Sequence, residues 1–157
     1  MTRPPPQVDN GWYAEQAALL LDSYRHWTGR ELLARSADPV EAARRLFLAP
    51  FVVVAHGPDR DPCFDYGNAA ALALFELDWE AFMQLPSRKS AEPANRQDRA
   101  ELLARVQRDG CIDDYSGVRI SARGRRFRIE RAMVWNLIDA SGRHRGQAAS
   151  FSRWQFL

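Results

Sequence analysis

The hydrophobic pattern of the chain changes at Gly110 from a helical repeat to alternation. Before this glycine, apolar residues recur at steps of three and four positions. After it they recur mainly at every second position in three stretches, 112–122, 125–138 and 146–156. Alternation is typical of strands with one buried face, and short turns between such stretches make neighbouring strands antiparallel. The C-terminal third is therefore predicted to be a three-stranded meander that must be covered by helices.

Two further strands are predicted ahead of this meander. Residues 51–55 form a β-branched apolar run, and residues 63–66 follow after a turn containing glycine and proline. Asn68 and Asp78 are each placed to cap a short helix, and Pro93 to begin a longer one. The expected fold is α+β, with a five-stranded antiparallel sheet and these middle helices on one face.

The chain divides by composition into three parts. Residues 1–8 contain three consecutive prolines and are expected to be a flexible arm. Residues 9–49 are expected to form an N-terminal helical extension, and residues 50–157 the sheet domain. A total of 157 residues suits one domain, so residues 9–157 are expected to form a single folded unit.

The extension is predicted to contain two helices. Asp9 or Asn10 would cap the first, and Gly29 would end it. The second would begin at Pro39, with Asp38 as its cap and Glu41 completing a capping box. Five residues of the first helix share one face, which would either cover the sheet or mediate a dimer. They are Tyr13, Ala17, Leu20, Tyr24 and Trp27.

The distribution of charge and the length of the apolar runs limit the partners and the location that can be expected. The net charge of +2 is too small to indicate nucleic-acid binding. The charge is unevenly distributed, because residues 1–86 carry seven basic and twelve acidic side chains, whereas residues 87–157 carry fifteen basic and eight acidic ones. The apolar run 46–55 is broken by Pro50 and is shorter than the roughly 20 residues that a membrane span requires. With no signal-peptide pattern, the expected location is the cytoplasm.

Metal-binding patterns are absent from the sequence. Cys63 and Cys111 form no CxxC pair, and the three histidines, His26, His56 and His144, are far apart. No metal site is therefore predicted, and no cofactor can be named. The sequence also lacks a phosphate loop, a nucleophile elbow and a zinc-protease motif, which favours a protein that is not an enzyme.

A resemblance to a known family rests on several short strings. Residues 64–75 resemble the second strand of a PAS domain and the helix that follows it. Five other strings resemble the MEKHLA domain family: LPSRKSA (85–91), DYSGVRI (114–120), GRRF (124–127), VWN (134–136) and GQAA (146–149). The resemblance covers residues 12–157.

Membership of this family implies a PAS-like fold and a sensory module. The resemblance also implies a bacterial protein of the stand-alone type, because this chain has no room for the homeodomain and leucine zipper found in plant members. It supplies no catalytic residues.

Four residues are candidates for contact with a small organic ligand. Arg131 shares its parity with the apolar residues of its strand, so an unbroken strand would point it inward, where an anion or an internal acid must pair with it; a bulge would turn it outward. Trp135 has the same parity and would line a pocket or pack in the core. Tyr115 would donate a hydrogen bond into a cleft or lie at a sheet edge. Asn68 would touch the ligand or only cap its helix.

A cluster of arginines surrounds the predicted hairpin at residues 123–124. Arg119, Arg125 and Arg128 are among them, and such a strip can hold phosphates. Because exposed aromatic residues do not alternate with these arginines, a solvated outer face is the expected role.

Three functions follow from these observations. The first is a PAS-like sensory module that binds a small ligand. The second is a protein-interaction module that forms a homodimer without a ligand. The third is a small enzyme on a cone-shaped α+β fold, for which Arg131 would be the inward polar residue.

Overall fold

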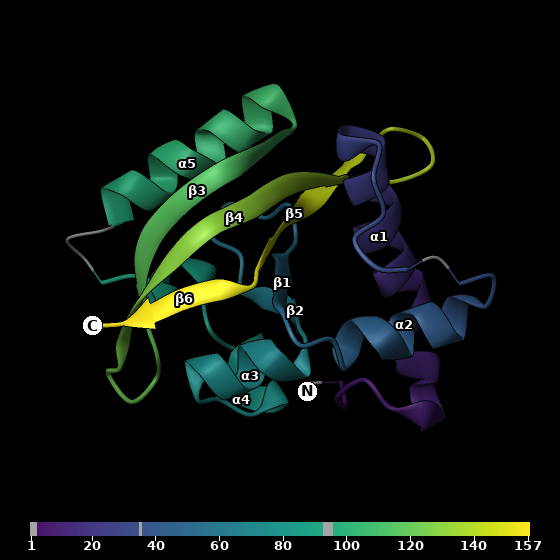
Figure 1. Ribbon diagram of the computed structural model, residues 1–157, viewed down its shortest axis with the longest axis horizontal. Helices are drawn as coiled ribbons and strands as arrows, with labels where there is room; N and C mark the ends of the chain where they lie inside the picture. Colours follow the sequence, from purple (N-terminus) through teal and green to yellow (C-terminus); the bar gives the residue numbers. More distant parts are fainter. Residues whose placement is uncertain (1–2, 35, 93–95) are drawn as a thin grey trace.

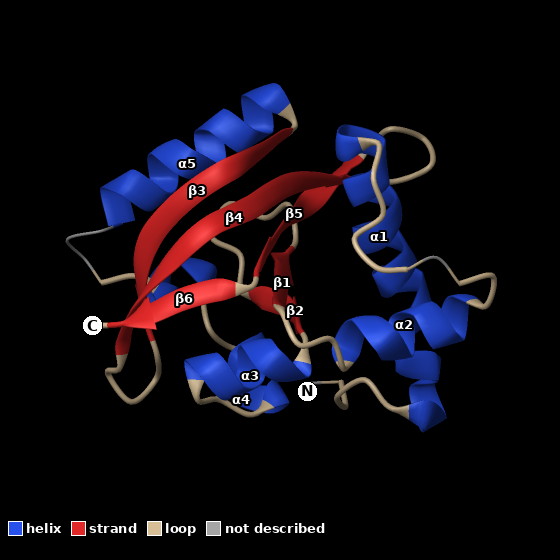
Figure 2. Ribbon diagram, in the orientation of Figure 1, coloured by secondary structure: helices blue, strands red, loops and turns tan. Residues whose placement is uncertain are grey.

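The computed structural model describes residues 3–34, 36–92 and 96–157, which form an antiparallel sheet with helices on both faces (Figures 1 and 2). The strands are β1 (Val52–His56), β2 (Phe64–Gly67), β3 (Cys111–Ile120), β4 (Arg126–Ile138), β5 (His144–Phe151) and β6 (Arg153–Phe156). The helices are η1 (Val8–Tyr13), α1 (Ala14–Thr28), α2 (Pro39–Phe47), α3 (Ala69–Phe75), α4 (Trp79–Met83), η2 (Ser87–Ser90) and α5 (Arg96–Asp109).

The sheet has the strand order β2-β1-β5-β4-β3, with β6 also paired to β4. The predicted final strand, 146–156, is divided into β5 and β6 by an unpaired break at Ser152. Both parts follow β4 in the same register, because Met133 pairs with Ser150 and Glu130 with Arg153. The predicted antiparallel sheet is therefore confirmed, with its last strand broken where it bends.

Helices cover the two faces of the sheet unequally. Helices α1 and α2 pack on one face, against a cluster that includes Val53, Tyr66 and Trp135. Helix α3 covers the other face through a second cluster, and α5 adds a smaller one through Leu102 and Val106. Helix α4 lies along the edge strand β2. The helical extension is therefore joined to the sheet as one layer of the fold (Figure 1).

Local capping signals account for most helix starts. Side chains of Asp38, Asn68 and Asp78 each accept a hydrogen bond from a backbone N–H in the first turn of α2, α3 and α4. The expected capping box at Glu41 does not form, because its carboxylate binds Arg44 and Arg45 instead. The predicted helix start at Pro93 lies outside the described residues.

The first helix begins later than the sequence predicts. Asp9 and Asn10 lie in the short helix η1, which is interrupted by left-handed backbone at Gly11 and Trp12 before α1 begins at Ala14. Aromatic packing accompanies the kink, since the Trp12 ring lies 6.0 Å from that of Phe47 between centroids. Gly29 ends α1 in left-handed backbone, as predicted.

The arm expected to be loose contacts the body of the domain through Arg3. Its guanidinium lies 4.1 Å from the ring centroid of Tyr13 and 5.5 Å from that of Trp79. The Trp79 indole donates a hydrogen bond to the Arg3 carbonyl at 3.1 Å.

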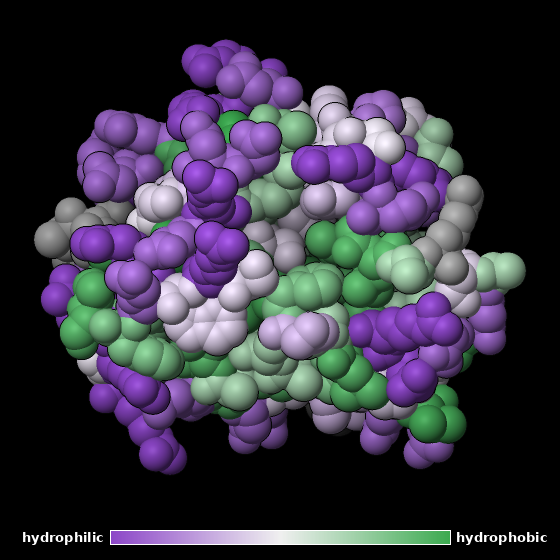
Figure 3. Space-filling view, viewed as in Figure 1, coloured by the Kyte–Doolittle hydropathy of each residue, from purple (hydrophilic) through white to green (hydrophobic). Residues whose placement is uncertain are grey.

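Figure 3 shows hydrophilic residues around the rim of one face and hydrophobic residues across its middle and lower part. Within the described residues, no helix combines the length and apolarity needed to cross a membrane.

Candidate ligand cavity

A cavity of about 70 Å³ lies between the sheet and helices α3 and α5. Side chains from β1, β2, β3, β4 and β5 line it on the sheet side. The lining is mainly apolar and includes Val54, Phe75, Leu102, Ile129, Val134 and Phe151. Six polar residues also line it, namely His56, Ser90, Arg99, Tyr115, Arg119 and Gln147.

Arg119 is buried at this cavity, with 8% of its surface exposed. It pairs across β3 and β4 with Phe127, so both side chains lie on the inner face of the sheet. Its guanidinium donates to the carbonyl of Val118 at 3.0 Å and lies 5.3 Å from the ring centroid of Tyr115. The sequence-based assignment of this arginine to a solvated face is therefore wrong, although its neighbour Arg128 is exposed.

Arg99 approaches the cavity from helix α5. Its Nη2 donates a hydrogen bond of 2.6 Å to the hydroxyl of Ser87. Burial lowers the pKa of Arg99 to about 10, and repulsion by Arg119 contributes. Asp61 acts on Arg99 at longer range, but its carboxylate is paired with Arg88 at 3.0 Å.

Neither cavity arginine has a carboxylate partner within 4.0 Å among the described residues. Buried guanidinium groups are ordinarily paired, because taking a charge out of water without compensation costs several kcal/mol. Arg99 and Arg119 therefore place two uncompensated positive charges beside one apolar cavity.

His56 presents an unmatched acceptor at the same place. Its Nδ1 lies 2.8 Å from the carbonyl oxygen of Gly57, which can only accept, so Nδ1 carries the proton. The pKa of His56 is lowered by burial, with smaller contributions from Arg99 and His144. The ring is therefore neutral near pH 7, and its buried Nε2 has a lone pair with no partner.

Tyr115 lines the cavity, which agrees with the cleft position that was one of its two predicted locations. Its ring crosses the backbone at Gly117 so closely that a Cβ there would lie 2.1 Å from the phenol oxygen. Glycine at this position is thus needed for the ring to lie over the backbone of β3, where Arg119 is 5.3 Å from the ring centroid. Whether Tyr115 contacts a ligand stays a prediction.

Arg131 is exposed and lies outside the cavity lining. Its backbone is left-handed, with φ of 50°, beside an irregularity in the pairing of β3 with β4. This irregularity shifts the alternation, so Ile129 and Ala132 both face the cavity. The expected inward orientation of Arg131 is wrong, because that expectation required an unbroken strand.

The same shift puts Trp135 on the opposite face of the sheet, fully buried against α1 and away from the cavity. Asn68 is also fully buried, but its amide is used within the protein. Its Oδ1 accepts from Val53 and Ala71, and its Nδ2 donates to the carbonyls of Leu46 and Phe51. Trp135 is thus a core residue and Asn68 a cap.

The leading-helix stripe is also distant from the cavity. Ala17, Leu20 and Tyr24 are buried against the sheet. Tyr13 and Trp27 are partly buried at the two ends of this contact, and Trp27 donates a hydrogen bond to the carbonyl of Asn136 at 2.9 Å.

Several of the strings that carry the family resemblance meet at the cavity. LPSRKSA (85–91) supplies Ser87, which holds Arg99, and DYSGVRI (114–120) supplies Tyr115 and Arg119. GQAA (146–149) supplies Gln147, whose amide donates to the carbonyl of Leu103 on α5 at 3.1 Å. The cavity is therefore the place where three of the strings that carry the family resemblance meet.

Among the described residues, no group of three His, Cys, Asp or Glu side chains could hold a metal ion.

The sequence pattern of the MEKHLA domain matches residues 14–156. The chain belongs to the MEKHLA domain family. Its curated relatives include the homeobox-leucine zipper proteins ATHB-15, 22% identical over 142 residues, and REVOLUTA, 26% identical over 149 residues, both from Arabidopsis thaliana. Each alignment covers 90% of this chain but only 17% and 18% of the relative. This MEKHLA domain thus spans about a sixth of the length of those proteins.

Solved structures show that the MEKHLA domain has a PAS-like fold. The PAS domain of a protein from Colwellia psychrerythraea superposes with a TM-score of 0.61 at 13% identity, covering 74% of this chain and 94% of that one. The light-state dimer of the fungal blue-light photoreceptor Vivid gives a TM-score of 0.58 at 12% identity, covering 96% and 97%. At these identities the likeness concerns the fold.

Proposed function

We propose that this MEKHLA domain is a sensory module that binds a small molecule in the cavity between its sheet and helices α3 and α5. The observation that carries the proposal is the unmatched polarity of the cavity. Arg119 is buried and Arg99 is half-buried, neither has a carboxylate partner among the described residues, and the Nε2 atom of His56 is buried without a partner. Buried polar groups in folded proteins are ordinarily satisfied, so a bound molecule would pair the two arginines, and a donor that enters with it, such as water, would pair Nε2 of His56.

Strand β4 provides a route from the cavity to the N-terminal helices. Val134 lines the cavity on one face, and the next residue, Trp135, packs against α1 on the other. A ligand that prefers one position of β4 would therefore shift the balance of conformers at α1. This arrangement supports a sensing role over simple storage of a small molecule.

The alternative functions have less support. The cone-fold enzyme required an inward polar residue at Arg131, which is exposed. A dimer through the leading-helix stripe would compete with the sheet, against which Ala17 and Leu20 are buried. We propose binding without catalysis, in the cytoplasm, with any homodimer formed through another surface.

A cavity-filling substitution tests the proposed function. A library of small fragments would be screened against the full chain by ligand-observed NMR, in parallel with the variants Ala132→Leu and Ala73→Leu. Ala132 lines the cavity, whereas Ala73 is exposed on α3. We expect fragments that bind the unmodified chain and Ala73→Leu but not Ala132→Leu. If every fragment that binds also binds folded Ala132→Leu equally well, the cavity is not the binding site.

A further inference from the structure

We infer that the cavity selects a small organic anion, with a carboxylate between Arg99 and Arg119 and a short hydrocarbon part against the apolar wall. This inference rests on the proposed function and adds the chemical class of the ligand. The two arginines come from different elements, α5 and β3, and line the same cavity.

The charge of the site requires an anion. Arg119 is nearly inaccessible to water, and Arg99 is held by the Ser87 hydroxyl, which supplies no negative charge. The Tyr115 ring adds a favourable contact to Arg119 but leaves its charge uncompensated. A carboxylate matches the planar donor fork of arginine and would compensate both cations at once.

The size and the wall of the cavity limit the rest of the ligand. A volume of about 70 Å³ corresponds to roughly five water molecules at about 15 Å³ each, so the cavity admits only a small organic molecule. Ile129, Ala132 and Val134 form an apolar wall from strand β4. A four-carbon monocarboxylate fits both limits, whereas inorganic phosphate would leave this wall without a partner.

A path for entry runs between α5 and the sheet. His56, Leu103 and Gln147, with Arg99, line both the cavity and a hollow on the outer surface. An anion passing from this hollow would meet Arg99 first and then Arg119. The contact of α5 with the sheet at this seam includes the hydrogen bond from Gln147 to the Leu103 carbonyl.

Butyrate and butyramide separate charge from shape in a direct test. Both would be titrated into the isotope-labelled full chain at matched ionic strength, with backbone amide shifts recorded by NMR. We expect butyrate to shift the amides of Ala132, Val134 and Ala149, which line the cavity. Butyramide, which has the same shape without the charge, should bind at least about tenfold more weakly.

Arginine variants assign the effect to the two residues. Arg99→Met and Arg119→Met should each weaken butyrate binding at least about tenfold, whereas Arg128→Met, at an exposed site on β4, should leave it unchanged. Replacing an unpaired buried charge by an apolar side chain should preserve the fold, which dispersed amide spectra would verify. If Arg119→Met fails to fold, Arg119→Lys replaces it, and it should retain more than half of the butyrate-induced shift.

Three results would overturn the inference. The first is equal binding of butyrate and butyramide, and the second is undiminished butyrate binding by the folded Arg99→Met and Arg119→Met variants. The third is a shift of the same amides by inorganic phosphate at least as large as that by butyrate. If neutral fragments bind in the cavity and butyrate does not, the anionic class is wrong while the proposed binding function stands.

Discussion

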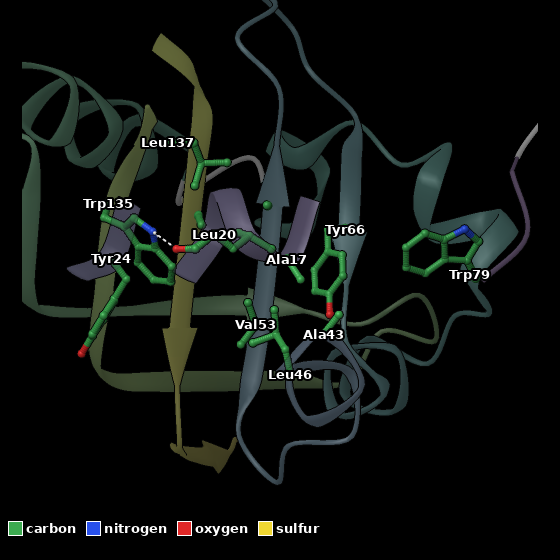
Figure 4. Close-up of a cluster of buried hydrophobic side chains, with 12 residues drawn as sticks. Ala17, Leu20, Tyr24, Ala43, Leu46, Val53, Tyr66, Trp79, Trp135 and Leu137 are labelled. Atoms are coloured by element: carbon green, nitrogen blue, oxygen red, sulfur yellow. Dashed lines mark hydrogen bonds between the residues drawn. The ribbon is translucent and has the colours of Figure 1, made fainter. Parts of the chain in front are cut away.

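The indole Nε1 of Trp135 donates a hydrogen bond of 3.2 Å to the backbone carbonyl of Leu20, and so joins strand β4 to helix α1 (Figure 4). The ring is fully buried, and Tyr24 packs edge-on against it with ring centroids 5.1 Å apart. This contact makes the N-terminal extension dependent on the face of the sheet opposite the cavity.

Substituting Trp135 should therefore destabilise the whole domain. Trp135→Phe removes the hydrogen bond and part of the ring, and should lower the free energy of unfolding by about 1–2 kcal/mol. Trp135→Ala should lower it by about 3–5 kcal/mol. Urea unfolding followed by circular dichroism measures both, with Trp154→Phe on β6 as the control, because that residue is only partly buried. Equal losses at the two tryptophans would contradict the core role of Trp135.

Removing residues 1–30 should cause the remaining chain to aggregate. The deletion uncovers Leu46, Val53 and Trp135, which form part of the cluster beneath α1. A large exposed apolar patch of this kind promotes association. Size-exclusion chromatography with light scattering would detect it. A stable, monomeric truncated chain would instead assign the leading-helix stripe to assembly of the full protein.

Two helix caps of the same geometry should differ in their energetic importance. Asn68 is fully buried and makes four hydrogen bonds through its amide, whereas Asp78 caps α4 at an exposed position. Asn68→Ala should cost about 3 kcal/mol of unfolding free energy, because it leaves buried backbone groups unpaired. Asp78→Ala should cost about 1 kcal/mol. Thermal or urea unfolding of the pair checks this, and similar losses would show that burial adds nothing to the cap.

Local signals in the sequence were sufficient for much of the fold. A cap depends on a few neighbouring residues, so the starts of α2, α3 and α4 could be predicted from Asp38, Asn68 and Asp78. The alternation after Gly110 likewise predicted the antiparallel meander, because a strand's two faces repeat every second residue.

The cavity could not be predicted in the same way, because it depends on where β4 breaks its alternation. The left-handed residue Arg131 lies in a string without glycine or proline, so nothing local marks the break. Without it, the sequence allowed Arg131 and Trp135 beside a ligand as well as outward and in the core, respectively, and it assigned Arg119 to solvent. The pairing of Arg119 with Phe127, which turns it inward, is a property of the register between two strands.

Gly117→Ala should disturb the cavity without unfolding the domain. The added methyl group would overlap the phenol of Tyr115, which must then rotate away from Arg119. We expect a loss of about 1–3 kcal/mol in unfolding free energy from overpacking, and changed amide shifts at Ala132 and Ile129. The double variant Gly117→Ala, Tyr115→Ala should recover part of that stability, since it removes the overlapping ring. No recovery would mean that the strand backbone, and not Tyr115, is the source of the strain.

The lowered pKa of His56 should make stability depend on pH below neutrality. Above about pH 6.5, the ordinary value for histidine, the ring is neutral in both folded and unfolded chains and contributes no pH dependence. Below it the unfolded chain takes up a proton while the buried ring, facing Arg99 on α5 and His144 on β5, does not. The folded state therefore loses at most about 1.4 kcal/mol per pH unit until the folded pKa is reached.

An asparagine at this position isolates the contribution of the ring. His56→Asn keeps a donor near the Gly57 carbonyl but cannot titrate, so its loss of stability between pH 7.5 and 5.5 should be smaller than that of the unmodified chain. His26→Asn, at an exposed site on α1, should retain the full loss. Urea unfolding at the two pH values gives the comparison. An equal loss in all three proteins would show that His56 protonates freely in the fold. Its Nε2 would then be open to water, and a bound ligand would no longer be needed to satisfy it.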